Sequence, residues 1–225
     1  DMRAPISVIV PTLNAGIGLH NTLFCLMEAL DAGLIREVIV SDAGSTDQTL
    51  EIAKDWGAEV VSGAPSRGGQ LQRGCDAAKG EWLLVLHADT VLSEGWGNAA
   101  AQHLQTGDAG WFSLQFDGGG VKGKLVAFWA NLRSRLGLPY GDQGLLVSRT
   151  LYDVVGGYRD IPLMEDVALA RALKGRLRRI DATAITSAVK YQKQGWLKRG
   201  GRNLITLLQY FAGADPEALT ERYRR

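Results

Sequence analysis

This sequence of 225 residues contains little cysteine, no long apolar run and almost no excess of either charge. Only Cys25 and Cys75 occur, and neither lies in a CxxC pair or beside a histidine, which argues against a thiolate metal site and favours two reduced thiols. Lysine plus arginine (25) nearly balance aspartate plus glutamate (24), whereas a general nucleic-acid binder carries a marked basic excess. No apolar run approaches the roughly 20 residues that a membrane-spanning helix needs.

Internal repeats, low-complexity tracts and linkers are also lacking, so we expect one domain with a C-terminal extension. An apolar strand is predicted from residue 6, and no signal peptide is expected ahead of it. Together with the two reduced thiols, this favours a cytoplasmic protein. The hydrophobic content of 46% is enough for one substantial core.

Two periodicities alternate in the first half of the chain. Short, continuous apolar runs predict strands at 6–10, 37–42, 58–63 and 81–88. Apolar residues at helical spacing predict helices at 19–30, 49–57 and 69–80. Strands that are apolar on both faces and separated by helices form a parallel sheet with helices on both sides.

The second half is less regular and markedly basic. Strands are predicted at 111–116 and 144–149, with one or two more within 177–191, and helices at 125–137, 166–175 and 196–213. From residue 171 to the end there are thirteen Lys or Arg and only four Asp or Glu. The last helix has Leu204, Leu208 and Phe211 on one face. We favour a solvated basic face whose apolar side packs on the core or on another subunit; the alternative is contact with an anionic membrane surface.

Polar residues follow all four strands of the first half, in the segments PTLNAG (11–16), SDAGSTD (41–47), SGAPSRGG (62–69) and HADT (87–90). Ligands of open α/β sheets bind beyond the carboxyl ends of the parallel strands. One polar strand end is weak evidence, but the coincidence of four predicts a binding site at this edge of the sheet.

Several residues at these strand ends have both a structural and a functional interpretation. Asp42 either closes a turn before Gly44, or accepts hydrogen bonds from a base or ribose while Gly44 lets the ligand approach the backbone. Asp89 either caps a helix beginning near Ser93, with His87 half-buried against it, or faces the cleft with His87. In the second case the carboxylate is a suitable ligand for Mg²⁺ or Mn²⁺ bridging a diphosphate.

An adjacent acidic pair, Glu165 and Asp166, stands at the start of a predicted helix. Carboxylates there complement the helix dipole, which is the structural interpretation. The same position after a proline-containing loop is also suitable for presenting a general base to a cleft. The sequence by itself leaves both interpretations open.

The segments SVIVPTLNAG, VSDAGSTDQT, SRGGQLQRG, LHADT, YGDQG and PLMED, in this order, resemble family 2 glycosyltransferases of the GT-A fold, over residues 6 to about 190. HADT, YGDQG, IPLMED and the C-terminal segment are most similar to a bacterial subgroup known as radical-SAM/selenodomain-associated or arsenosugar-biosynthesis-type transferases. The resemblance implies an α/β, Rossmann-like mixed sheet with helices on both faces. It would comprise residues 1–191, with a nucleotide-sugar half (1–92) and an acceptor half (93–191), followed by an amphipathic helical extension (192–225).

The resemblance also implies a chemistry: a UDP- or GDP-linked sugar donor, a divalent cation (Mn or Mg), inversion at the anomeric carbon, and a small-molecule or lipid acceptor. Carried over by position, Asp166 is the catalytic base with Glu165 beside it, and Asp89 holds the metal. His87 replaces the first aspartate of the family's DxD motif. The nucleotide-sugar site would comprise Pro11, Thr12, Asn14, Asp42, Gly44, Arg67, His87, Ala88 and Asp89, with Asp142 and Gln143 on the acceptor side.

Other interpretations remain. Asp142 and Gln143 fit a turn before the 144–149 strand nearly as well. Lys190 or Lys193 is suited to folding back onto the diphosphate. The segment YQKQGW (191–196) lacks the arginine of the QxxRW motif of processive members, which favours transfer of a single sugar.

A nucleotidyltransferase is disfavoured because PTLNAGIGLH contains no Arg or Lys, and a dinucleotide-binding dehydrogenase because GxGxxG is missing. A non-catalytic sugar-nucleotide-binding protein is the third alternative. If the acceptor is a lipid, we expect the protein to lie peripherally at the inner face of the membrane.

Overall fold

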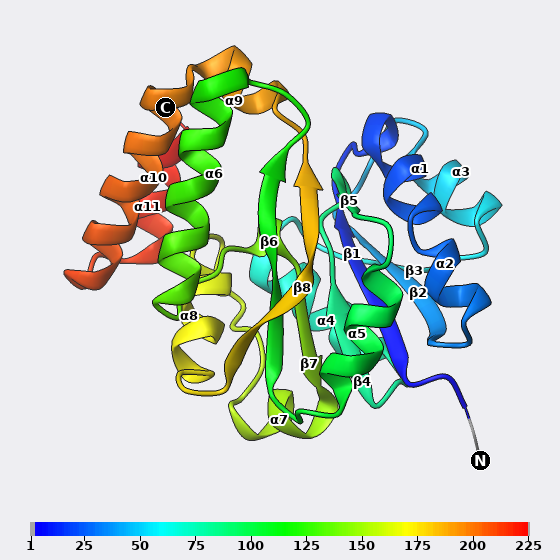
Figure 1. Ribbon diagram of the computed structural model, residues 1–225. Helices are drawn as coiled ribbons and strands as arrows, with labels where there is room; N and C mark the ends of the chain where they lie inside the picture. Colours follow the sequence, from blue (N-terminus) through cyan, green and yellow to red (C-terminus); the bar gives the residue numbers. More distant parts are fainter. Residues whose placement is uncertain (1–2, 225) are drawn as a thin grey trace.

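One mixed sheet of eight strands forms the centre of the molecule, with helices on both sides (Figure 1). The computed structural model describes residues 3–224. The strand order is β3-β2-β1-β4-β7-β6-β8-β5. The strands are β1 (Ile6–Thr12), β2 (Ile35–Asp42), β3 (Glu59–Ser62), β4 (Trp82–Val85), β5 (Thr90–Leu92), β6 (Ala109–Phe116), β7 (Leu145–Ser148) and β8 (Leu177–Thr186).

The first four strands are parallel, as predicted: β1 lies between β2 and β4, and β3 pairs with the outer side of β2. Alternate side chains of β1 enter two separate cores. Val8 and Val10 pack in one cluster with Leu19, whereas Ile9 packs in the other with Leu71. Because both faces of β1 and β4 are covered, these two strands consist mostly of apolar residues, which explains their continuous apolar runs.

The helices are α1 (Gly16–Phe24), α2 (Met27–Asp31), α3 (Thr49–Asp55), α4 (Arg67–Ala77), α5 (Trp96–Leu104), α6 (Gly120–Arg135), α7 (Arg149–Val154), α8 (Glu165–Ala172), α9 (Val189–Gln194), α10 (Trp196–Phe211) and α11 (Pro216–Arg224), with a 3₁₀ turn at Gly141–Gln143. The predicted helix 19–30 is divided in two. The amide of Leu26 bonds to the carbonyl of Leu23, a tighter i→i−3 turn that ends α1.

The second half makes the sheet mixed, because β7 runs antiparallel to both β4 and β6. β8 is parallel to β6 and antiparallel to β5. The prediction of one or two strands within 177–191 is confirmed by one strand, β8, and α9 begins at Val189. β6 ends at Phe116, so β8 has no partner beyond Thr186, and the carboxylate of Asp117 accepts a hydrogen bond from the Ala188 amide just before α9.

The C-terminal helices pack beside α6 and α8 (Figure 1). Trp196 is buried against Phe116, with ring centroids 5.0 Å apart. Leu204, Leu208 and Phe211 are exposed, so the interpretation that this face packs on the protein's own core is wrong. Leu207, on another side of α10, is buried. Among the described residues, no helix is both long enough and apolar enough to cross a membrane. The predicted division at residue 191 falls inside α9 and stays a prediction.

Candidate active site

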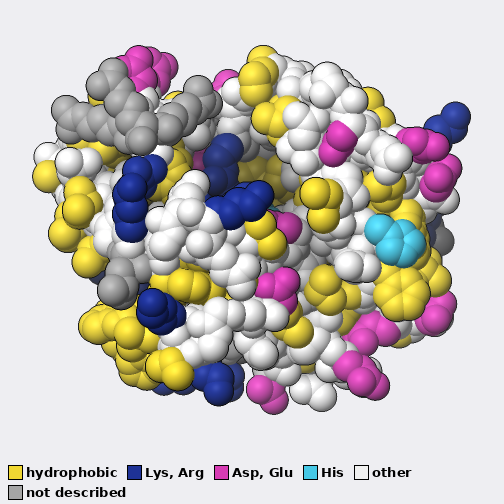
Figure 2. Space-filling view, turned by 90° about the horizontal axis from the view of Figure 1, so that it is seen from above, with side chains coloured by type: hydrophobic (Ala, Val, Ile, Leu, Met, Phe, Trp, Pro, Cys, Tyr) yellow, Lys and Arg dark blue, Asp and Glu magenta, His cyan; other side chains and the backbone are white. Residues whose placement is uncertain are grey.

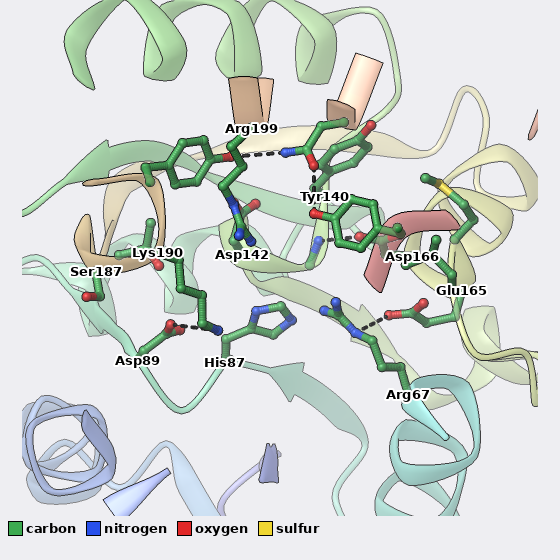
Figure 3. A pocket seen from close by; sticks show the side chains of 17 residues that line it. Arg67, His87, Asp89, Tyr140, Asp142, Glu165, Asp166, Ser187, Lys190 and Arg199 are labelled. Carbon is green, nitrogen blue, oxygen red and sulfur yellow. Dashed lines mark hydrogen bonds and ion pairs between the residues drawn. The ribbon is translucent and has the colours of Figure 1, made fainter. Parts of the chain in front are cut away.

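A pocket lies where the end of β4, the start of α4, the start of α8 and the C-terminal helices meet (Figure 3). Asp89 and Asp166, 77 positions apart in the sequence, both line it. So do four other predicted site residues: Arg67, His87, Asp142 and Glu165. Figure 3 shows His87 between two ion pairs, with Asp89 and Lys190 on one side and Arg67 and Glu165 on the other.

Arg67 and Glu165 form an ion pair, with 3.2 Å between Nε and Oε1. Glu165 is buried, and both burial and its neighbour Asp166 raise the pKa of its carboxyl group, whereas Arg67 opposes this rise. The start of α4 is held against the loop that leads to α8: the amide of Gly68 donates to the carbonyl of Ile161, 3.0 Å away. A side chain at Gly68 would meet the carbonyl oxygen of Arg159 at 1.9 Å, so the close approach requires glycine.

Asp166 is oriented by two backbone amides. Its Oδ2 accepts a hydrogen bond of 2.7 Å from the amide of Gly141, and its Oδ1 accepts one of 2.8 Å from the amide of Val167. Met164, the residue before α8, has a left-handed backbone (φ 66°), which is uncommon for a non-glycine residue. The turn at Met164 points the start of α8, with its two carboxylates, towards the pocket.

The loop of residues 140–143 forms another wall. Gln143 does not line the pocket: it is buried, and its Oε1 accepts a 2.6 Å hydrogen bond from Ser134. Its neighbour Asp142 does line the pocket, and its Oδ1 is buried without a hydrogen-bond partner among the described residues. Burial raises the pKa of Asp142 to about 6; Arg133 opposes the rise, and Asp166 and Asp89 add to it.

His87 and Asp89 occupy the end of the fourth strand, as the alternation predicted. Burial is the main cause that lowers the pKa of His87, followed by the charge of Arg67, so the imidazole is neutral at pH 7. Oδ2 of Asp89 lies 3.7 Å from Nζ of Lys190. The alternative interpretation, in which Asp89 caps a helix near Ser93, is wrong, because β5 follows directly and α5 begins at Trp96.

The remaining predicted nucleotide residues lie at the ends of β1 and β2, in the loops that follow these strands or, for Ala88, after β4, and they do not line this pocket. Asp42 is 1% exposed, and its carboxylate accepts hydrogen bonds from Thr12, from the Gly44 amide, and from the amide and hydroxyl of Ser45. Burial raises the pKa of Asp42, but these hydrogen bonds outweigh it and hold the pKa below its usual value. Asp42 therefore closes the turn before Gly44, as its structural interpretation predicts. Its contact with a base stays a prediction.

Asn14 links the same two loops. Its side-chain Oδ1 accepts a hydrogen bond of 2.8 Å from the backbone amide of Thr46, while the backbone amide of Asn14 donates to the Ser45 hydroxyl. Pro11 is half-buried, and Ala88 is buried in the core beside Val8. Contact with the nucleotide therefore stays a prediction for six residues: Pro11, Thr12, Asn14, Asp42, Gly44 and Ala88.

One wall of the pocket is aromatic and was not predicted from the sequence. Tyr140, Tyr191 and Tyr223 all line it. The hydroxyl of Tyr223 donates to Oδ1 of Asn203 at 2.7 Å, and Nδ2 of Asn203 donates to the hydroxyl of Tyr191 at 3.2 Å. This chain of hydrogen bonds joins α9, α10 and α11, which are short segments whose relative packing has no local signal in the sequence.

A divalent cation would find few protein ligands here. Within residues 3–224, no group of three or more His, Cys, Asp or Glu side chains is arranged to hold a metal. Asp89 is a partly exposed carboxylate and His87 a neutral imidazole. Mg²⁺ often takes only one or two protein carboxylates and keeps water and substrate phosphate as its other ligands, so this set fits a cation that binds together with a diphosphate.

Comparison with known proteins places the chain in a family. A family model described as glycosyl transferase family 2 matches residues 7–145. The chain belongs to glycosyl transferase family 2. The match covers β1 to the start of β7 and therefore both the strand-end loops and the loop of Asp142.

Curated relatives align over part of the chain. A PGL/p-HBAD biosynthesis glycosyltransferase of Mycobacterium bovis (strain BCG / Pasteur 1173P2) is 36% identical over 101 residues, which are 41% of this chain and 39% of that protein. Glucosyl-3-phosphoglycerate synthase of Mycobacterium tuberculosis (strain CDC 1551 / Oshkosh) is 33% identical over 95 residues, 38% of this chain and 29% of that protein. The aligned part of this chain therefore spans well under half of each relative.

Solved structures show the same fold. Glucosyl-3-phosphoglycerate synthase from Mycobacterium tuberculosis, in complex with Mn²⁺, UDP and glucosyl-3-phosphoglycerate, has a TM-score of 0.55 at 24% identity, covering 81% of this chain and 70% of that chain. TarS 1–349 of S. aureus, in complex with UDP-GlcNAc, has a TM-score of 0.62 at 17% identity, covering 81% and 58%. The predicted GT-A fold is confirmed.

Proposed function

We propose that this protein is an inverting, metal-dependent glycosyltransferase that moves one sugar from a nucleotide-diphosphate sugar to an acceptor hydroxyl. The observation that carries the proposal is the single pocket in which Asp89 and Asp166 lie together with the cations of Arg67, Lys190 and Arg199. Cations suit a diphosphate leaving group, and a carboxylate beside it suits proton removal from an acceptor.

The proposed base is Asp166 rather than Glu165. Glu165 is 2% exposed and its Oε1 is engaged by Arg67, whereas the two oxygens of Asp166 each accept only one backbone hydrogen bond. A carboxylate oxygen has a second lone pair, so Asp166 remains able to accept the acceptor's proton. Glu165 would then act by holding Arg67 in place.

The reaction can be written in one displacement. The acceptor oxygen attacks the anomeric carbon from the face opposite the diphosphate, and its proton passes to Asp166. The bond from the anomeric carbon to the phosphate oxygen breaks, and its electron pair stays on the departing nucleoside diphosphate. Lys190 and Arg67 stabilise the negative charge that develops there. A divalent cation, bound by Asp89 and the diphosphate, would supply further charge neutralisation.

The proposal extends to the nucleotide of the donor and to the subgroup of the family. The related synthase was solved with UDP, and TarS with UDP-GlcNAc, so we expect a UDP-linked donor ahead of a GDP-linked one. The segments HADT, YGDQG and IPLMED support the radical-SAM-associated subgroup. The acceptor would be a hydroxyl group of a small molecule or of a lipid, and the predicted cytoplasmic location stays a prediction.

A thermal-shift panel of nucleotide sugars, with and without Mn²⁺, tests the donor site. At a ligand concentration of 100 Kd, binding to the folded state alone stabilises by about 2.7 kcal/mol, which shifts Tm measurably. We expect Mn²⁺-dependent stabilisation by one UDP- or GDP-sugar, and its loss in Asp89→Asn. Stabilisation by nucleoside triphosphates alone would instead indicate a nucleotidyltransferase. Stabilisation by a sugar nucleotide that is never hydrolysed or transferred would indicate a non-catalytic binding protein.

A further inference from the structure

The helix α6 exposes an apolar stripe along its outer side. Val121, Leu125, Phe128, Leu132 and Leu136 recur at spacings of three or four residues and are all exposed. Trp129, 62% exposed, lies next to Phe128, which is 61% exposed. Two neighbouring aromatic side chains that are both mostly in water are costly for a helix whose face has no further role.

The opposite side of α6 is the one that packs on the protein. Its fully buried residues are the small ones, Gly123, Ala127, Ala130 and Ser134. A Cβ atom at Gly123 would lie 3.2 Å from the ring of Trp196, so α10 leaves no room for a larger side chain at this position. The large apolar residues of α6 therefore face away from the core because the inner side is already filled.

The neighbouring helix α10 continues this apolar surface. Leu204, Ile205, Leu208 and Phe211 are 43 to 58% exposed. α6 and α10 contact each other, and Figure 2 shows hydrophobic side chains along the left and lower left of the molecule, over these two helices, with Lys and Arg side chains between them. We call the exposed apolar residues of the two helices, together with Leu136, the α6–α10 face.

The two segments that carry the α6–α10 face contain charges of one sign. Residues 118–141 and 182–214 contain no Asp or Glu. Within these segments α6 carries Lys122, Lys124, Arg133 and Arg135, and α9 and α10 carry Lys193, Lys198 and Arg202 outside the active-site pocket. Lys190 and Arg199 line the pocket instead. At 100° per residue, Lys122 falls on one edge of the α6 stripe, and Lys124 and Arg135 fall on the other. An apolar stripe with basic edges is the pattern of a helix that lies in the interface of an anionic bilayer.

We propose that the α6–α10 face docks on an anionic lipid membrane surface, with its aromatic and aliphatic side chains entering the interfacial region and its Lys and Arg side chains on the head groups. A second copy of the chain is a poorer occupant, because a symmetric contact would bring two basic surfaces together without acidic partners. The docking is independent of the proposed transferase activity, since it needs neither donor nor acceptor.

Vesicle binding by the whole protein tests the proposal. Co-sedimentation would compare vesicles of phosphatidylcholine alone with vesicles that contain about one-third phosphatidylglycerol. We expect at least about tenfold stronger partitioning onto the anionic vesicles, falling as salt rises, because several basic residues lie near the surface and their attraction is screened. Equal partitioning onto both vesicles, or none onto either, would overturn the proposal.

Two pairs of variants separate the α6–α10 face from the rest of the surface. Phe128→Ser should reduce partitioning several-fold, whereas Phe24→Ser, which replaces a phenylalanine that is 62% exposed on α1, should leave it unchanged.

Lys122→Gln with Lys124→Gln should weaken binding about tenfold or more; Lys54→Gln with Lys79→Gln is the charge-matched control. All four residues of the charge pairs are exposed, so folding, checked by circular dichroism, should be retained. Equal effects of test and control variants would contradict the proposal, as would a dimer in light scattering that Phe128→Ser abolishes.

Discussion

The backbone amide of Gly141 and the carboxylate of Asp166 are joined by a 2.7 Å hydrogen bond that links the loop before β7 to the start of α8. This bond fixes one face of the carboxylate and leaves the other directed at the pocket that Asp89 and Lys190 also line. A base held in this way needs no reorientation when an acceptor arrives, which is the condition for efficient proton transfer.

Asp166→Asn should lower the rate of sugar transfer by about 10² to 10⁴, because an amide cannot take the acceptor's proton. The amide oxygen can still accept from Gly141, so donor affinity should stay nearly unchanged. Initial rates and donor titration by thermal shift measure the two effects. Asp181→Asn, at a carboxylate whose side chain is 93% exposed, is the control. Turnover that survives in Asp166→Asn would remove this residue from its role.

Gly141→Ala should impair the site without unfolding the protein. A Cβ atom there would lie 2.7 Å from Nε2 of His87 and 3.6 Å from Oδ2 of Asp166, so the imidazole or the loop must move. A displacement of about 1 Å can cost on the order of 10²-fold in rate, and we expect a loss of that order in kcat. The control is Gly200→Ala in α10, where a Cβ atom meets nothing within 4 Å and the helix should gain about 0.5–1 kcal/mol. Wild-type kcat in Gly141→Ala would contradict the tight contact.

Asp142 should make the unfolding free energy depend on pH. Burial raises its folded-state pKa to about 6, above the value in the unfolded chain. The folded state therefore holds the proton where the unfolded state has released it, and stability falls as the pH rises from about 4 to 6. Asp142→Asn carries no charge, so without ligand it should be more stable than the wild type at pH 7, by at most about 3 kcal/mol. Urea unfolding between pH 4 and 7.5 measures the difference, and parallel stability curves for the two proteins would refute it.

The pair of Arg67 and Glu165 should show strong coupling. Arg67→Met leaves the Glu165 carboxylate buried without its cation and should destabilise by about 3 kcal/mol or more. Adding Glu165→Gln removes the orphaned charge, so the double variant should recover part of this loss. A double-mutant cycle from urea unfolding gives the coupling energy. Additive effects would mean that the two side chains do not depend on each other.

Two structural details could not be read from the sequence, for identifiable reasons. The sequence left open whether 177–191 holds one strand or two. β6 ends at Phe116 and offers no further partner, so β8 stops at Thr186 and a helix follows. The role of Gln143 on the acceptor side stays a prediction: its side chain is buried, bonded to Ser134 and, at 3.3 Å, to the carbonyl of Phe112. Both outcomes depend on partners more than eight positions away, which periodicity within a segment does not report.

The sequence alone determined the parallel strands β1 to β4 and the polar loops at their ends. The central strands β1 and β4 are buried on both faces and require continuous apolar runs, and the chain must turn after each strand. It also determined the family, through motifs carried by those loops. Only the tertiary structure decided that Tyr191, Asn203 and Tyr223 close the pocket, and that the large side chains of α6 face outward. Helical spacing identifies an apolar face, but which face is covered depends on how much room the neighbouring elements leave.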